Sequence, residues 1–155
     1  MGQGDQIETF VGGCLCGAVR FSCTEEPSLV SYCHCRMCQK QTGGPFSVMA
    51  NFPRAALIWS GKGRILRPSS PLAVRGFCGD CGSPLSFQYA DSEHTSVSVG
   101  ALDHPERVRP TKQGGIESRI GWVTIDPQLP AERVDDDPDY CALLLKTDWR
   151  PPRWD

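Results

Sequence analysis

The most constraining feature of this chain is the way its cysteines are grouped. Seven of the nine cysteines fall into three tight clusters, spaced C-X-C, C-X-C-X-X-C and C-X-X-C. Thiols this close in sequence do not easily form disulfides with one another, but they can converge on a metal ion. The clusters are Cys14 with Cys16, then Cys33 with Cys35 and Cys38, then Cys78 with Cys81. Two pairs and one triplet predict one closed four-sulfur zinc site and one three-sulfur site with an open position.

Length, charge and hydropathy exclude several classes of protein. A chain of 155 residues is the size of one domain with a hydrophobic core. A net charge of -2 provides no basic surface for nucleic acid, and no apolar run reaches the length of a membrane span. The first residues lack the basic and apolar regions of a signal peptide. The lack of a signal peptide and the odd number of cysteines predict a cytoplasmic protein with metal-bound thiols rather than a secreted disulfide scaffold.

The alternation of apolar and polar residues predicts an all-β, or mainly β, domain with frequent Gly and Pro turns. In the segment 18–23, Val19, Phe21 and Cys23 share one face, and the segment 96–99 repeats this pattern. Further strands are expected at 46–52, 57–59, 72–77, 85–89 and 122–125.

Helix signals are scarce. A helix of one or two turns is predicted over 36–42, where Gly43 and Gly44 would stop it. The segment 139–146 fits either a short C-terminal helix or a last strand. Residues 135–138 are typical of a solvated loop and residues 150–153 of a tail.

Both cysteine pairs lie beside glycines and next to a predicted strand. Glycine permits the positive φ angles that a chain needs in order to wrap around a metal ion. Two such turns facing each other would form a tetrahedral zinc site that ties two hairpins together and does no chemistry. Its ligands would be Cys14, Cys16, Cys78 and Cys81. Buried free cysteines are the alternative, but they do not explain the paired spacing.

The triplet lies where a strand is expected to pass into a helix. The sulfurs of Cys33 and Cys35 would lie at the strand end, and that of Cys38 on the first helical turn, whose N-terminus favours thiolates. Three thiolates make zinc a weak Lewis acid, better suited to holding and exchanging a thiolate than to activating water.

Two alternatives stay open for the triplet. A fourth protein ligand from His34, His94, His104 or Cys141 would close the site, although alternation aims His34 away from it. The triplet could also remain free of metal and be redox-active. The remaining cysteines, Cys23 and Cys141, are predicted to pack as small hydrophobic residues.

The three clusters, in this order, resemble those of the glutathione-dependent formaldehyde-activating enzyme family, which includes centromere protein V. The resemblance covers about residues 7 to 133. It rests on the stretches 13–21, 33–40 and 76–85, with later pieces at 100–103, 117–122 and 129–130. It implies a zinc domain of this family over residues 1–133, and a C-terminal extension over 134–155 that packs on the same domain or trails from it.

The resemblance also implies a fold like that of Mss4, with β-sheets folded over a zinc ion. It implies a structural zinc ion on Cys14, Cys16, Cys78 and Cys81, and a catalytic zinc site at Cys33, Cys35 and Cys38. The namesake activity joins formaldehyde to glutathione, giving S-hydroxymethylglutathione, which is a carbon–sulfur lyase reaction in reverse. The chain departs from the family at one position: many members have a histidine just before the isoleucine aligned with Ile116, where this chain has Gly115.

The leading hypothesis is therefore a zinc-dependent carbon–sulfur lyase acting on a glutathione-like thiol and a small carbonyl compound such as formaldehyde. The developing oxyanion would be held by backbone N–H groups around Gly43 and Gly44, or by Gln41 or Thr42.

Four further side chains are candidates for the same site. Phe46 and Trp59 would wall the pocket, and Arg36 and Lys40 would receive the carboxylates of the thiol. Two rival hypotheses are a non-catalytic zinc module that contacts other proteins, and a protein that buffers metal or undergoes cysteine redox chemistry.

Overall fold

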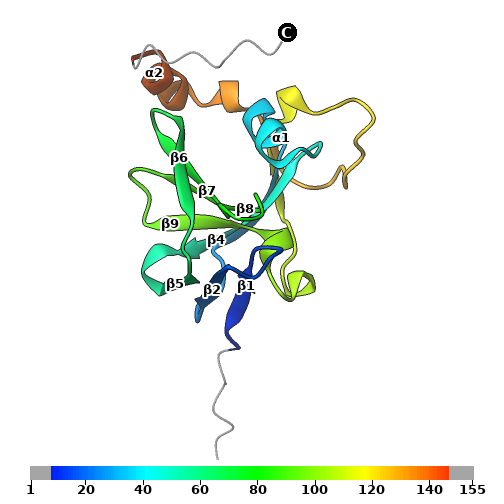
Figure 1. Cartoon of the computed structure of the whole chain (residues 1–155). Helices are drawn as coiled ribbons and strands as arrows, with labels where there is room; N and C mark the ends of the chain where they lie inside the picture. The colour runs from blue at the N-terminus through cyan, green and yellow to red at the C-terminus, as the bar shows by residue number, and fades with distance from the viewer. Residues whose placement is uncertain (1–7, 147–155) are drawn as a thin grey trace, which may run out of the picture.

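The computed structural model describes residues 8–146, and these residues form two β-sheets with short helices at their edges (Figure 1). The smaller sheet has the strand order β1-β2-β5, and the larger has the order β11-β10-β3-β4-β9-β8-β7-β6. Pairing is antiparallel except that β10 runs parallel to both β3 and β11. The predicted mainly β class is confirmed.

The elements have the following bounds. The smaller sheet consists of β1 (Phe10–Gly13), β2 (Val19–Cys23) and β5 (Leu57–Gly61). The larger sheet consists of β3 (Leu29–Cys33), β4 (Ser47–Pro53), β6 (Ile65–Ser70), β7 (Ala73–Phe77), β8 (Pro84–Tyr89), β9 (His94–Ser98), β10 (Lys112–Gly114) and β11 (Ala131–Glu132). The helices are α1 (Arg36–Thr42) and α2 (Pro138–Lys146), and the 3₁₀ turns are η1 (Arg54–Ala56), η2 (Val99–Ala101), η3 (Pro105–Arg107), η4 (Ile116–Ser118) and η5 (Val134–Asp136).

Most of the predicted elements are present. The segments expected as strands form β2, β4, β5, β7, β8 and β9, and the helix expected before Gly43 is α1. The undecided segment 139–146 is helical, as α2. The tail at 150–153 lies outside the described residues. None of the helices between residues 8 and 146 combines the length and the apolar character needed to cross a membrane.

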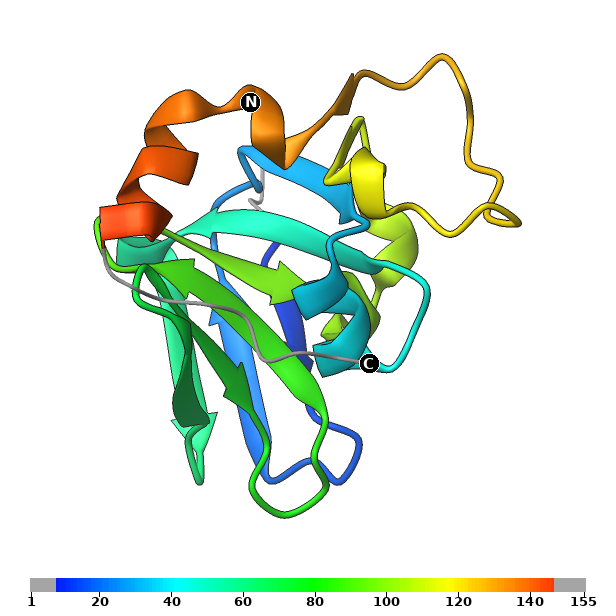
Figure 2. The ribbon, with the colours of Figure 1, turned by 90° about the horizontal axis from the view of Figure 1, so that it is seen from above.

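The strand predicted at 122–125 is wrong. Trp122 is 73% exposed, and the Val123 N–H donates to the Ile120 carbonyl (2.9 Å) within a turn instead of to a neighbouring strand. Gly121 and Pro127 on either side favour turns, so the short apolar run lies in the long connection that swings outward in Figure 2.

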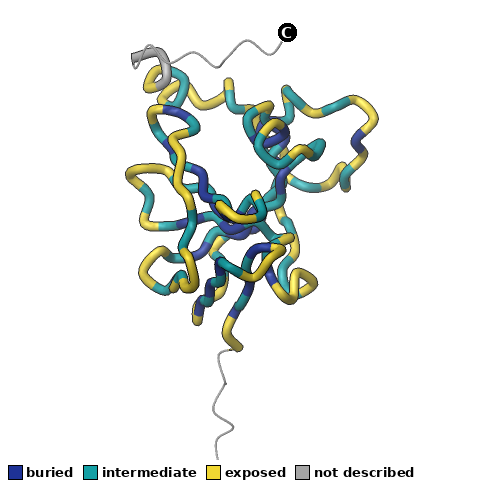
Figure 3. The backbone as a smooth tube through the Cα atoms, viewed as in Figure 1, coloured by how far each residue is buried: buried dark blue, intermediate teal, exposed yellow. Residues whose placement is uncertain are grey.

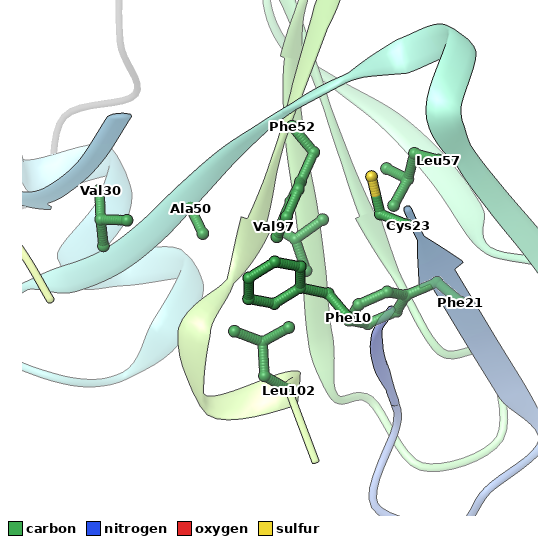
Figure 4. Close-up of a cluster of buried hydrophobic side chains, with 9 residues drawn as sticks. All are labelled: Phe10, Phe21, Cys23, Val30, Ala50, Phe52, Leu57, Val97 and Leu102. Atoms are coloured by element: carbon green, nitrogen blue, oxygen red, sulfur yellow. The ribbon is translucent and has the colours of Figure 1, made fainter. Parts of the chain in front are cut away.

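The hydrophobic core lies where the two sheets face each other, and buried residues concentrate there (Figure 3). The rings of Phe10 from β1 and Phe52 from β4 pack with their centroids 5.3 Å apart. Figure 4 shows the nine buried side chains of this cluster: Phe10, Phe21, Cys23, Val30, Ala50, Phe52, Leu57, Val97 and Leu102. The prediction that Cys23 is a core residue is confirmed.

The larger sheet and helix α1 together position the cysteine triplet. Strand β3 ends at Cys33 and α1 begins at Arg36, so the predicted strand-to-helix junction is present. In the sheet, Cys33 pairs with Ser47 of β4 on one side and with Gly114 of β10 on the other. Helices α1 and α2 both stand at the upper end of the molecule in Figure 1, opposite the smaller sheet.

Candidate metal centres

The first candidate centre, the four-cysteine cluster, is built from two turns of the same design. In the β1–β2 turn, the Cys14 N–H donates to the Val19 carbonyl (3.0 Å), and the N–H of Gly17, whose φ is 79°, donates back to the Cys14 carbonyl (3.1 Å). In the β7–β8 turn, Cys78 donates to the Ser83 carbonyl (3.0 Å) and Gly82, with φ 76°, donates to Cys78 (2.9 Å). Glycine is suited to the left-handed position in both turns.

The four sulfurs of this cluster have the spacing that a zinc ion requires. All four Sγ atoms lie within 4.8 Å of one another. The Sγ atoms of Cys14 and Cys16 are 3.5 Å apart, and those of Cys16 and Cys78 are 3.8 Å apart. A disulfide would bring two sulfurs to about 2 Å, whereas four sulfurs at about 2.3 Å from one zinc ion stand about 3.8 Å apart. The cluster therefore fits a tetrahedral ion and could hold one.

Hydrogen bonds from one serine support the cluster. Ser83 lies beside the sulfur of Cys81 (Oγ to Sγ 3.1 Å), and its Oγ also accepts from the Leu15 N–H (3.0 Å). Ser83 is thereby connected to both turns. The side-chain and backbone hydrogen bonds of Ser83 lower the pKa of Cys81 to about 6, which favours the thiolate that a metal ligand must be.

The second candidate centre, the three-cysteine cluster, surrounds the start of α1. The Sγ atoms of Cys33, Cys35 and Cys38 lie within 4.8 Å of one another. Cys35 precedes the helix, and its sulfur accepts the N–H of Cys38 (3.4 Å), as an N-cap side chain does. Cys38 is buried, whereas Cys33 and Cys35 are partly exposed, so the cluster lies close to the surface of the protein.

The strand β10 closes this cluster from another direction. Gly115 follows β10 with φ 64°, and a Cβ atom placed on it would lie 2.9 Å from the backbone nitrogen of Cys35. The backbone at 115 is therefore in contact with the cluster, at the position where the resemblance described above led us to expect a histidine. No larger side chain can occupy this position without a shift of Cys35.

His34 does not complete the cluster. It is fully buried, and its Nε2 donates to Oε1 of Gln113 (3.0 Å). Its carbonyl accepts from Nε2 of Gln39 (2.7 Å), which also donates to the Ser118 carbonyl (3.0 Å). Among the described residues, no histidine, carboxylate or further cysteine joins the three sulfurs in the ligand group. The expectation that His34 points away is confirmed, and its role is to hold β10 and α1 together.

One residue that the sequence analysis missed touches the three-cysteine cluster. Arg75 of β7 is buried, at 6% exposure, and its Nη2 donates to the sulfur of Cys38 (3.4 Å). Hydrogen bonds from Cys33 and Cys35 lower the pKa of Cys38, and the charge of Arg75 lowers it further, although burial opposes both. The available signal was an arginine in the middle of a predicted strand, on the same face as Ala73 and Phe77.

Three of the groups first considered as holders of an oxyanion are already used, whereas the corresponding role of Gln41 stays a prediction. The Gly43 N–H donates to the Gln39 carbonyl (2.9 Å) at the end of α1, and the Gly44 N–H donates to the Thr42 hydroxyl (3.3 Å). The same hydroxyl donates to the Cys38 carbonyl (2.8 Å). The prediction that these backbone groups and Thr42 receive an oxyanion is therefore wrong, because helix capping uses their hydrogens.

The predicted walls and cationic partners of the site are only partly found there. The Phe46 ring packs against His34 (centroids 5.8 Å apart), which follows Cys33 in the chain. Trp59 instead packs against Phe21 (5.1 Å) in the smaller sheet, beside the four-cysteine cluster. Arg36 donates within its own helix to Oε1 of Gln39 (2.5 Å), and a carboxylate-binding role of Lys40 stays a prediction.

Two tyrosines, one from β8 and one from α2, lie near enough to the three-cysteine cluster to feel its charge. The rings of Tyr89 at the end of β8 and Tyr140 on α2 meet edge to face, with centroids 6.4 Å apart. Burial raises the pKa of both phenols, and the negative charge of the cysteine sulfurs raises it further. Tyr140 thus connects the C-terminal helix to the neighbourhood of the cluster.

Comparison with known proteins gives three findings. A family model described as glutathione-dependent formaldehyde-activating enzyme matches residues 9–117. A protein of Schizosaccharomyces pombe named an uncharacterized lyase is 28% identical over 141 residues, which cover 89% of this chain and 88% of that protein. A crystal structure of a Rhodobacter sphaeroides protein is 24% identical, covers 64% of this chain and 91% of that one, and superposes with a TM-score of 0.49.

The family match includes all seven clustered cysteines and both sheets except β11. A TM-score below 0.5 does not by itself establish a common fold, so the assignment rests on the family model. Since that model matches well over half of the chain, the protein belongs to the glutathione-dependent formaldehyde-activating enzyme family.

Proposed function

We propose that this protein is a zinc-dependent carbon–sulfur lyase that joins a small, glutathione-like thiol to a small carbonyl compound such as formaldehyde. One observation carries the proposal: three convergent thiols, one buried and two partly exposed, have no fourth protein ligand among the described residues. A site of this composition leaves a position for a substrate sulfur. Family membership and the lyase name of the yeast relative support the reaction class.

In this proposal Cys33, Cys35 and Cys38 form the catalytic centre. Zinc bound there would supply a Lewis acid that stabilises an added thiol as its thiolate. The chain itself fixes the three sulfurs: β3 carries the first, the helix cap the second and the first turn of α1 the third. Formaldehyde adds rapidly to thiols in water, so most of the catalytic gain would come from holding the two reactants together.

The four-cysteine cluster has a structural role in this proposal, with a second zinc ion on Cys14, Cys16, Cys78 and Cys81. Four ligands leave no position for substrate. The family domain would end near residue 133, and the following segment would be an extension that packs on it through Tyr140 and Tyr89. We place the protein in the cytoplasm, where its thiols would remain reduced.

The decisive experiment compares the wild-type protein with Cys35→Ser. Serine keeps an oxygen at the N-cap position of α1, so the fold should survive while one metal ligand is lost. Zinc content should fall from two ions per chain to one, and the rate of glutathione addition to formaldehyde should fall to the uncatalysed rate. Cys141→Ser is the matched control, because Cys141 lies outside both clusters.

Each rival hypothesis predicts a different result. A wild-type protein with two zinc ions and no rate above the uncatalysed reaction would contradict the proposed activity and favour a module that contacts other proteins. Reversible oxidation of the three-cysteine cluster, with release of zinc, would favour a redox or metal-buffering role.

A further inference from the structure

Arg75 has more hydrogen-bonding capacity than the protein uses. Its guanidinium group is buried on β7, and its contact with the sulfur of Cys38 engages only Nη2. The Nε and Nη1 atoms are buried and have no hydrogen-bond partner among the described residues. Buried polar groups are nearly always paired, and leaving a charged donor unpaired costs more than leaving a neutral one. The free donors therefore point to a missing partner.

The surroundings of Arg75 restrict what that partner can be. The guanidinium carbon lies 4.8 Å from the centroid of the Phe87 ring, so one neighbour of the group is an aromatic surface. Cys38 occupies another direction. A guanidinium has no acceptor and stays protonated, so the partner must be an acceptor, and an anionic oxygen binds it best.

A purely electrostatic role would leave part of this arrangement unexplained. A counter-ion to the cysteine sulfurs needs only the positive charge, and lysine can supply that charge. The planar group with two unused donors, adjacent to Cys38, is suited to an oxygen that arrives with substrate. Three of the earlier oxyanion candidates, the backbone N–H groups of Gly43 and Gly44 and the Thr42 hydroxyl, already donate within the protein.

We propose that Arg75 donates a hydrogen bond from its unused Nε–H to the oxygen of the carbonyl substrate as that oxygen becomes negatively charged. This inference rests on the proposed thiol-addition function and names the residue that stabilises its charge. In the step, the thiolate sulfur forms a bond to the carbonyl carbon, and the C=O π electrons move to the oxygen. The oxygen then takes up one proton, balancing the one lost by the thiol, and Arg75 keeps its own protons.

Formate is the probe for this site. It is a one-carbon anion whose oxygens resemble the charged oxygen of the addition product. Titration of the zinc-loaded protein with sodium formate should shift the ¹H–¹⁵N signal of the Arg75 Nε–H group, which is assigned by its absence from Arg75→Lys. This binding measurement needs neither thiol nor carbonyl, so it remains informative even if the proposed activity fails.

The kinetics of three variants test whether Arg75 stabilises the negatively charged oxygen during the reaction. Arg75→Gln should lower kcat/KM by about 100-fold to 1,000-fold, the usual effect of removing one oxyanion donor, while zinc content stays at the wild-type value. Arg75→Lys should restore part of this loss. Arg67→Gln is the matched control, because Arg67 pairs with Arg75 across β6 and β7 but is exposed. It removes the same charge and should keep the wild-type rate.

The results distinguish a failure of the role of Arg75 from a failure of the proposed reaction. A formate shift at Arg75 together with the selective loss in Arg75→Gln supports the proposal. The opposite result is that formate does not shift the Arg75 Nε–H signal and that Arg75→Gln is either as active as Arg67→Gln or loses zinc. This result would show that Arg75 only balances the charge of the sulfurs. A wild-type protein that binds formate through Arg75 but gives no rate above background would overturn the proposed reaction and the role of Arg75 in it, leaving an anion-binding site.

Discussion

Replacing Gly115 by alanine tests whether the backbone after β10 forms part of the three-cysteine cluster. The residue has φ 64°, a conformation that costs an L-amino acid roughly 1–2 kcal/mol. The added Cβ would also lie 2.9 Å from the nitrogen and 3.2 Å from the Cβ of Cys35. Relieving such a contact costs roughly 1–3 kcal/mol. We therefore expect Gly115→Ala to lower the free energy of unfolding by about 2–5 kcal/mol.

Gly63 provides the matched control. Its φ is 74°, but a Cβ placed on it would meet nothing within 4 Å. Gly63→Ala should therefore lose only the conformational share, roughly 1–2 kcal/mol, and part of that is offset because alanine restricts the unfolded chain. Urea unfolding followed by tryptophan fluorescence gives the free energy of each variant.

Zinc content is the second measurement for this pair of variants. If both clusters hold zinc as proposed, Gly115→Ala should lose the ion of the three-cysteine cluster, because the contact displaces Cys35. It should keep the other ion, and Gly63→Ala should keep both. Equal stability of the two variants, each with two zinc ions, would refute the claim that Gly115 packs against the cluster. It would also mean that a histidine at position 115 needs no rearrangement of this chain.

Three further changes probe the core, the metal sites and the pH dependence. Phe52→Ala, at a fully buried site, should lower the free energy of unfolding measured in urea by about 3–5 kcal/mol. Trp122→Ala, at an exposed site, should change it by no more than about 0.5 kcal/mol. Similar losses in the two variants would contradict the assigned core. Cys78→Ser should lower the melting temperature more than Cys38→Ser, because only the first breaks a link between the two sheets; the reverse order in thermal melts would count against it. Burial raises the pKa of Cys23, so the free energy of unfolding should fall as pH rises above about 9, by at most about 1.4 kcal/mol per pH unit. Cys23→Ala should remove that part of the slope, and an unchanged slope would show that this thiol does not contribute.

Features set by neighbours in sequence were predictable, and those set by distant pairing were not. The turn at Cys14 and Cys16 and the helix stop at Gly43 depend on a few adjacent residues, and both are found as expected. Strand β6 was missed because Pro68 interrupts it and most of its residues are exposed, so it carries no alternation of burial. The error at 122–125 has the opposite cause: an apolar run was present, but no neighbouring strand pairs with it.

The candidate site shows the same division. Local spacing predicted all three cysteines of the triplet. Arg75 reaches Cys38 because the sheet places β7 in the order β3-β4-β9-β8-β7 relative to the strand that leads into Cys38. No local sequence pattern encodes that order. Gly115 likewise contacts Cys35 through the parallel pairing of β10 with β3, which joins segments about 80 residues apart.

The two cysteine clusters differ in the length of chain that each must close, and this has a consequence for the order of folding. Cys16 and Cys78 are 62 positions apart, so their sulfurs can meet only after much of the chain has been arranged. Cys33 and Cys38 are close neighbours, and their thiols can bind a metal ion while the rest is still unfolded. With zinc at both clusters as proposed, a newly made chain would bind its first ion at the triplet. The four-cysteine cluster would bind the second ion only after the two sheets had come together.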